Sequence, residues 1–255
     1  MTLMPASWDE VAYDYHRSVG DTGDSYHRTY VNPVVFGILG DIKGLSILDL
    51  ACGQGYLSRI LAKKGAKVIG IDISEKMLEI AQDSERDHPL GVKYLLCSSS
   101  DMSKVPSSSM DWIVSTFGFH DIKEIEPTID ECSRVLKDGG KLVFAIPHPF
   151  TYAHRVQDEE GYYLKMRHYM SIREIPHPKY KDSEVVAFHR PLSFYFERLF
   201  SVGFQMTAFR EITAELARGR PIKDKQLLAY KREMPGFLVT GFVKCNGETG
   251  SVRSC

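Results

Sequence analysis

The stretch ILDLACGQGYLSRILAKKGAKVIGID, residues 47–72, decides the fold of this chain. It opens with an apolar run, turns at Gly53 and Gly55, and continues with apolar residues at helical spacing as far as Gly65. A second apolar run follows and ends on an acid, Asp72. A strand, a tight turn, a helix and a second strand in this order predict two parallel strands joined by a crossover helix.

The same alternation of strand and helix extends along the chain. Further apolar, strand-like segments lie at residues 92–99, 110–119, 141–147, 205–212 and 236–244. Helices are expected over 56–65, 74–85 and 124–140, the last closed by a glycine pair. We therefore predict an α/β fold of the Rossmann-like, doubly wound kind, with a seven-stranded, mostly parallel sheet, helices on both faces and an inserted lid after the fifth strand.

The chain divides into five segments by composition and periodicity. Residues 1–46 are aromatic and helical in character and are expected to form an N-terminal lid, and residues 47–147 hold the alternating core. Residues 148–192 are rich in His, Tyr, Arg and Pro with weak periodicity, which is typical of an insertion on the substrate side. Residues 193–244 are expected to complete the sheet, and the small polar residues 245–255 to form a flexible tail.

The composition restricts the partners and the compartment. The 255 residues carry a formal net charge of -1, so no overall positive field favours nucleic acid or an acidic membrane. No apolar run reaches the ~20 residues that span a bilayer, and no signal peptide is visible, which favours the cytoplasm. The five cysteines are scattered without a C-x-x-C, which argues against disulfides and zinc, and Cys52, Cys97 and Cys132 are expected to be buried.

The glycine turn could hold several ligands, and neighbouring residues narrow the choice. A phosphate-binding P-loop needs G-x-x-x-x-G-K-[ST], which is absent. A dinucleotide fingerprint needs a third glycine at position 58, which is Ser58. Asp72 stands where a ribose-binding acid belongs in such folds. These observations exclude a P-loop and make a dinucleotide less favoured, the alternative to a bound ligand being a tight turn that binds nothing.

The sequence resembles the class I S-adenosylmethionine-dependent methyltransferases, in particular the small-molecule group with methyltransferase domains of types 11 and 25. The resemblance is carried by "ILDLACGQGYLSRILAKKGAKVIGIDIS", "SSSDMSKVP", "MDWIVSTFGFHDI" and "RVLKDGGKLVFAIP", in family order. It covers about residues 8–150. Ala51 replaces a glycine that is frequent in the family, but alanine occurs there as well.

The resemblance implies a core over 47–147 that binds S-adenosyl-L-methionine and releases S-adenosyl-L-homocysteine. In it, the backbone at Gly53 and Gly55 would meet the methionyl part, Asp72 the ribose, and Asp101 the exocyclic amine of adenine. Tyr15 would be an aromatic lid residue. The full set implied to bind the cofactor is Tyr15, Tyr30, Asp49, Ala51, Gly53, Gly55, Tyr56, Asp72, Ile73, Met77, Ser100, Asp101, Met102, Ser115, Thr116 and Phe117.

Two histidines are candidates for a catalytic base. A base helps only where the acceptor must lose a proton, as in O-methylation. His120 follows the fourth strand and His148 the fifth, both at the edge of the sheet where ligands bind. The alternative for His120 is packing beneath the cofactor or capping the next helix. The spacings of the histidines from 148 to 189 match no metal-ligand pattern, so no metal is expected.

Missing motifs favour a small methyl acceptor. No N/D-P-P-Y/F follows the fourth strand and no Pro-Cys nucleophile is present, both of which nucleic-acid methyltransferases use. We therefore expect a small-molecule acceptor, methylated on O, N or C, and no nucleic acid. The alternatives are a protein of this fold that binds the cofactor without methylating, or a protein or nucleic-acid methyltransferase. The insertion is expected to form an aromatic pocket wall, or else a lid that packs or makes a homodimer contact.

Overall fold

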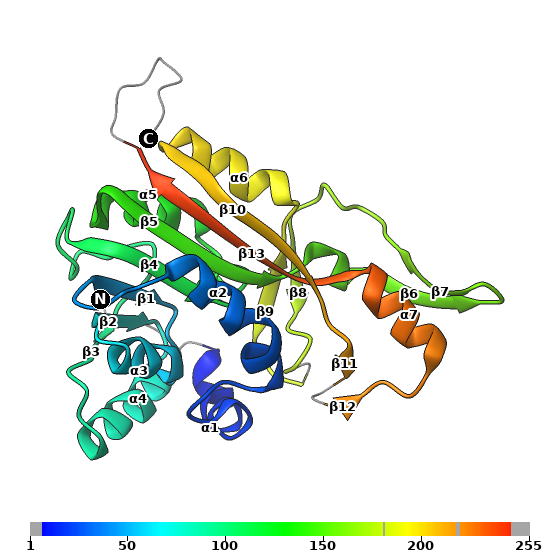
Figure 1. Ribbon diagram of the computed structural model, residues 1–255, viewed down its shortest axis with the longest axis horizontal. Coiled ribbons are helices and arrows are strands. Elements are labelled where there is room, and N and C mark those ends of the chain that lie inside the picture. Colours follow the sequence, from blue (N-terminus) through cyan, green and yellow to red (C-terminus); the bar gives the residue numbers. More distant parts are fainter. Residues whose placement is uncertain (1–6, 181, 218–219, 246–255) are drawn as a thin grey trace.

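A seven-stranded sheet forms the centre of the molecule (Figure 1). The computed structural model describes residues 7–180, 182–217 and 220–245. The sheet has the strand order β10-β13-β5-β4-β1-β2-β3. The strands are β1 (Ser46–Leu50), β2 (Lys67–Asp72), β3 (Lys93–Leu96), β4 (Met110–Thr116), β5 (Leu136–Pro147), β10 (Phe204–Thr213) and β13 (Pro235–Lys244). The first five are parallel and β13 runs antiparallel to both neighbours, which confirms the predicted fold class.

Helices cover both faces of the sheet. They are α1 (Trp8–Val19), α2 (Asn32–Leu39), α3 (Tyr56–Lys63), α4 (Glu75–Asp87), α5 (Ile125–Val135), α6 (Leu192–Ser201) and α7 (Lys225–Glu233), with a π-helical turn η1 (His27–Val31) before α2. Side chains alternate between the faces along a strand. Ile47 accordingly joins the core that includes Leu57 of α3, and Leu48 joins the core that includes Ile129 of α5. Two apolar cores therefore hold one sheet between two helical layers.

One helix ends earlier than the sequence indicated. The glycine pair at 139–140 was expected to close a helix over 124–140, but α5 ends at Val135. Leu136 is fully buried and pairs with Met110 of β4, so it already belongs to β5. The residues between Leu136 and Lys141 form a bulge in which Gly139 takes a φ of +73°. The two glycines therefore belong to a bulge in β5 and not to the end of a helix. The sequence did not distinguish the two, because a bulge and a helix end both need the backbone freedom of glycine.

The residues from 148 to 192 contain strands that the weak periodicity did not predict. A short 3-10 turn, η2 (Pro149–Tyr152), leads to the hairpin β6 (His154–Asp158) and β7 (Gly161–Lys165), which projects beside α7 (Figure 1). A second pair, β8 (Arg173–Pro176) and β9 (Val186–His189), follows. The chain between β8 and β9 reaches α1, because Trp8 contacts the rings of His177 and Tyr180 edge-on. A third small pair is β11 (Leu216–Ala217) and β12 (Arg220–Pro221).

Three further expectations concern the burial of cysteines, membrane-spanning helices and the end of the chain. Cys52, Cys97 and Cys132 are free and buried, as predicted. Across the part of the chain that the structure describes, every helix is too short or too polar to traverse a bilayer. Most of the tail that was expected to be flexible, residues 246–255, lies outside the described residues.

Candidate functional site

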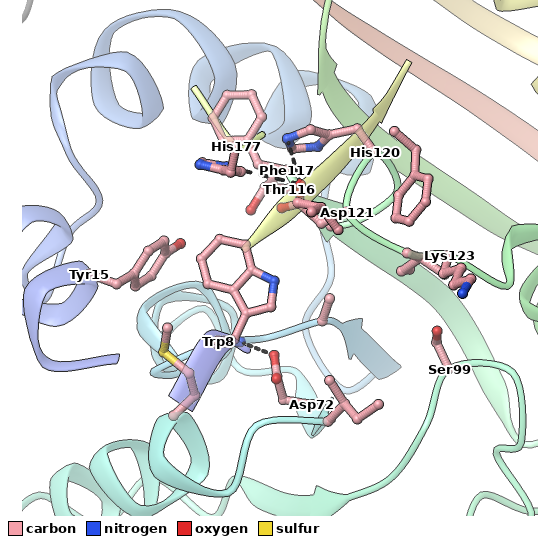
Figure 2. Close-up of a pocket in the computed structure, with 18 of the residues that line it drawn as sticks. Trp8, Tyr15, Asp72, Ser99, Thr116, Phe117, His120, Asp121, Lys123 and His177 are labelled. Carbon is pink, nitrogen blue, oxygen red and sulfur yellow. Dashed lines mark hydrogen bonds and ion pairs between the residues drawn. The ribbon is translucent and has the colours of Figure 1, made fainter. Parts of the chain in front are cut away.

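One pocket of about 560 Å³ lies at the carboxyl ends of β1, β2 and β4 (Figure 2). Its walls come from α1, the turn after β1, the end of β2, the loop after β3, the turn after β4 and the β8–β9 region. Ligands of open parallel sheets bind at this edge, because the crossover connections separate there. The pocket is therefore the candidate site.

The turn after β1 presents backbone atoms to the pocket, because the residues that line it have a small side chain or none. Ala51, Gly53 and Gly55 all take a positive φ, between 53° and 79°. A side chain at Gly53 would extend toward Tyr15 and Met77, which line the same pocket. Gly55 does not line it: a Cβ there would lie 2.4 Å from the hydroxyl of Tyr94. The first glycine thus keeps the pocket open, and the second lets α3 begin against Tyr94.

Asp72 is fixed in the pocket wall by two backbone hydrogen bonds. Its Oδ2 accepts from Gly53 N at 2.7 Å and its Oδ1 from Ser74 N at 2.9 Å. Burial raises the pKa of Asp72, while these two bonds act in the opposite direction. Ser74 also begins α4, since its hydroxyl accepts from Met77 N. The acid at the end of β2 is therefore held rigidly, with lone pairs left for a ligand.

Asp49 lies beneath the glycine turn and not in the pocket. It is 2% exposed, and its Oδ2 accepts a hydrogen bond from Ser58 Oγ at 2.5 Å. Burial raises the pKa of Asp49 to about 7, against the effect of the Ser58 hydrogen bond. The residue that replaces the third glycine of a dinucleotide fingerprint thus joins α3 to β1.

Aromatic side chains close one side of the pocket. Tyr15 and Trp8, both on α1, meet edge-on with ring centroids 6.0 Å apart. The Lys179 ammonium lies 5.5 Å from the centroid of the Tyr15 ring. Tyr30 is elsewhere: its hydroxyl accepts from Leu216 N and it does not line the pocket.

The loop after β3 contributes serines to the pocket. Ser98, Ser99 and Ser100 line it together with Ile73 and Met77. Asp101, which the resemblance places at the adenine edge, is exposed and does not line the pocket. Met102 is fully buried in the core, and its backbone N–H donates to Glu131. The three serines are therefore the hydroxyl groups that this loop contributes to the pocket wall.

Two hydroxyl side chains fix the end of β4 to its surroundings. Ser115 is fully buried and donates to Leu50 O at 2.9 Å, which ties β4 to β1. Thr116 lines the pocket, and its hydroxyl lies 3.2 Å from that of Tyr56, which is itself outside the pocket. Phe117 also lines the pocket and takes a φ of +58°. Positive φ is uncommon for a bulky residue and is found where a site over-determines the backbone.

His120, Asp121 and His177 converge at the end of the pocket opposite to Asp72 (Figure 2). His120 Nε2 lies 3.2 Å from Asp121 Oδ1, and His177 Nε2 lies 4.0 Å from the same oxygen. One ligand atom from each residue lies within 4.8 Å of the other two. Burial, with smaller effects from His177 and Arg190, lowers the pKa of His120 to about 3. Burial also lowers the pKa of His177 to about 4 and raises that of Asp121.

His148, the second candidate base, does not line the pocket. It is 1% exposed, its Nδ1 accepts from Phe150 N, and its Nε2 lies 3.1 Å from Glu211 Oε1. These contacts join the end of β5 to β10, so the surroundings of this histidine are those of a structural residue.

The structure thus brings together some of the residues singled out from the sequence and separates others. Those that line the pocket are Tyr15, Ala51, Gly53, Asp72, Ile73, Met77, Ser100, Thr116, Phe117 and His120. Those that do not are Tyr30, Asp49, Gly55, Tyr56, Asp101, Met102, Ser115 and His148.

Several lining residues were not singled out from the sequence as site residues. Asp24 and His27, ahead of α2, are 2.8 Å apart between Oδ1 and Nδ1. Burial alone would raise the pKa of Asp24, but the His27 contacts lower it to about 2. Asp121 and His177 are 56 residues apart in the sequence, so no local motif could join them. The one available signal was the run of histidines after residue 148.

Comparisons of the sequence with known proteins find similarity to methyltransferases. Residues 48–144 match the family model of a methyltransferase domain. A ubiquinone biosynthesis O-methyltransferase of Coxiella burnetii (strain Dugway 5J108-111) is 28% identical over 143 residues, 55% of this chain and 59% of that protein. An "Uncharacterized protein" of Haemophilus influenzae is 33% identical over 135 residues, 51% of this chain and 53% of that protein. The chain thus spans little more than half the length of these curated relatives.

Solved structures match a larger share of the chain. An S-adenosylmethionine dependent methyltransferase from Mesorhizobium loti has a TM-score of 0.70 at 25% identity, covering 83% of this chain and 96% of that one. A structure from Listeria monocytogenes has a TM-score of 0.67 at 25% identity, covering 87% and 98%.

Proposed function

We propose that this chain, which belongs to the class I S-adenosylmethionine-dependent methyltransferases, transfers a methyl group from S-adenosyl-L-methionine to a small-molecule acceptor. The observation that carries the proposal is the arrangement of the pocket. A rigid acid and a bare glycine backbone lie at one end, and a cluster of buried ionisable groups lies at the other. A ligand seated on Asp72 would therefore leave room for an acceptor beside His120 and Asp121.

The residues present fit the cofactor. Gly53 leaves the space that a Cβ would fill, and the Asp72 carboxylate, held by Gly53 N and Ser74 N, would accept from two ribose hydroxyls. Ile73 and Met77 offer apolar contact for a base, and the serines from 98 to 100 offer hydroxyl groups to its edge. When bound, S-adenosylmethionine supplies a methyl group activated by a positively charged sulfur.

The chain's own residues would align the reactants and exclude water. In-line displacement of a good leaving group depends mainly on alignment in a dry site. Thr116 and Phe117 line the pocket beside His120 and Asp121 (Figure 2), and the Phe117 ring can face a positive charge. Trp8 closes the pocket against His177 and Tyr180, which limits the access of water.

Two measurements test this function. Isothermal titration with S-adenosylmethionine and S-adenosylhomocysteine should show that both bind, and failure of both to bind would refute the cofactor assignment. Incubation with S-adenosylmethionine and a small-molecule metabolite extract should then release S-adenosylhomocysteine. Binding without any release would instead favour a protein that uses the cofactor without methylating. Mass spectrometry of the product identifies the acceptor.

A further inference from the structure

The carboxyl group of Asp121 is buried in the pocket wall without the partners that such a group needs. Within the described residues its Oδ1 has no hydrogen-bond partner, although the Nε2 atoms of His120 and His177 face it at 3.2 and 4.0 Å. Buried polar atoms are almost always paired, and unpaired ones occur at functional sites. The Asp121 side chain is 10% exposed, so bulk water does not take the place of a partner.

The hydrogen bonds of His177 decide what kind of partner fits. The backbone N–H of Lys179 donates to His177 Nδ1 at 3.2 Å, so Nδ1 carries a lone pair and not a proton. The proton of the neutral ring is therefore on Nε2, the atom that faces Asp121. A metal ion on Nε2 would need the lone pair that this tautomer lacks. Only His120 and Asp121 of this cluster would remain as ligands, so the cluster suits a proton better than a metal.

We propose that Asp121 is the base that accepts the acceptor's proton, and that the acceptor is a phenol-like hydroxyl compound; this rests on the proposed function. The O–H bond breaks and its proton passes to the Asp121 carboxylate. The acceptor oxygen forms a bond to the methyl carbon as the carbon–sulfur bond breaks and its electron pair stays on sulfur. The carboxylate becomes a neutral acid while the sulfonium becomes a neutral thioether, so charge balances.

Asp121 suits this role better than His120. A general base works best when its pKa is near the operating pH. Burial raises the pKa of Asp121 above its ordinary value, which makes its carboxylate a stronger base than an ordinary one, whereas the pKa of His120 is lowered to about 3. His120 and His177 are then positioning residues, since both face the carboxylate. Other ionisable groups whose charge is coupled to that of Asp121 are Arg190, Asp72, Tyr152, Tyr180 and Tyr195.

The surroundings favour a hydroxyl acceptor over an amine. An ordinary amine would pair with the carboxylate as an ammonium ion and would have no lone pair with which to attack. A phenol is neutral in the pocket and loses its proton as it attacks. Phe117, Phe188 and Trp8 line the same pocket, and their rings can contact a planar aromatic acceptor.

The test compares wild-type protein with Asp121→Asn on substituted phenols of graded acidity, measuring S-adenosylhomocysteine release. Asp83→Asn is the matched control, because Asp83 is on the exposed surface of α4 and pairs with Arg86 there. We expect wild-type rates to vary little with phenol acidity, and Asp121→Asn to lower kcat by about 10²–10⁴-fold for weakly acidic phenols. The loss should shrink for phenols that are already ionised at the assay pH. Mass spectrometry should locate the methyl group on oxygen.

A second pair of variants separates positioning from folding. His177→Gln keeps an N–H donor toward Asp121, whereas His177→Phe removes it. Loss of the donor destabilises the carboxylate, so the acidic limb of the kcat/KM pH profile should move to higher pH in His177→Phe and return in His177→Gln. Melting temperatures and cofactor affinity of all variants are measured in parallel.

Distinct results would overturn the proposal. A loss in Asp121→Asn that is equal for all phenols would make Asp121 structural. Turnover of amines but of no phenol, or of neither, by a protein that binds S-adenosylmethionine would refute the hydroxyl class. Activity lost in a chelator and restored by Zn²⁺ would assign the cluster to a metal. Failure to bind S-adenosylmethionine refutes the proposed function itself.

Discussion

Ser58 Oγ donates a 2.5 Å hydrogen bond to Asp49 Oδ2, which joins α3 to β1 directly beneath the glycine turn. The pair explains why an acid stands in a strand that is otherwise apolar. Asp49 is 2% exposed and Ser58 is fully buried, so each depends on the other for a polar partner.

This pair predicts a pH dependence of stability. Burial raises the pKa of folded Asp49 to about 7 from an ordinary value of 3.8. A raised pKa contributes stability that is fully present below the unfolded pKa and is lost as pH rises through the folded one. Asp49→Asn keeps an acceptor for Ser58 and carries no charge. It should therefore gain up to about 4 kcal/mol relative to wild type between pH 4 and pH 8, at 1.36 kcal/mol per pKa unit.

Thermal unfolding of both proteins at pH 4 and pH 8 measures this difference. Asp83→Asn, which removes an exposed charge on α4, should follow the wild type at both values. Equal pH dependence in Asp49→Asn and wild type would show that Asp49 is ionised at neutral pH in the folded protein.

Asp72, which lines the pocket, and Asp101, which does not, allow two acidic residues to be compared as contributors to cofactor binding. Asp72→Ala should weaken S-adenosylhomocysteine binding by about 2–4 kcal/mol, because charge-assisted hydrogen bonds to the ribose are lost. Asp101→Ala should leave the affinity within about twofold, because Asp101 is exposed and outside the pocket. Titration calorimetry checks both. A large loss in Asp101→Ala would restore the adenine contact that the family resemblance implied.

Gly55 and Gly91 form a matched pair. They take nearly the same φ, 79° and 81°, but a Cβ at Gly55 would lie 2.4 Å from Tyr94 Oη, whereas nothing lies within 4 Å of one at Gly91. Gly91→Ala should therefore lose about 1 kcal/mol through backbone strain alone, and Gly55→Ala about 2–4 kcal/mol. Adding Tyr94→Phe should recover part of the Gly55→Ala loss. Chemical denaturation measures these differences, and equal losses at the two positions would contradict the packing role of Gly55.

The sequence was sufficient to predict the sheet and part of the pocket wall, for a local reason. Asp72, Gly53 and Thr116 end strands or follow them directly, so their place at the sheet edge follows from the strand pattern. The cluster around Asp121 depends on the chain between β8 and β9 folding back over the pocket, which no local periodicity encodes. His148 shows the converse: it follows β5 as predicted, yet it turns to Glu211 of β10, a partner that only the tertiary structure supplies.

Trp8 provides a direct optical test of the pocket. The chain has two tryptophans: Trp8 lines the pocket and contacts Tyr15, His177 and Tyr180 edge-on, whereas Trp112 is buried within the sheet. Binding of S-adenosylhomocysteine should therefore change the tryptophan fluorescence of wild type and of Trp112→Phe, but not that of Trp8→Phe. Trp8→Ala should weaken binding by about tenfold, or ~1.4 kcal/mol, because the aromatic closure is lost. A fluorescence change that survives in Trp8→Phe and disappears in Trp112→Phe would place the ligand away from α1.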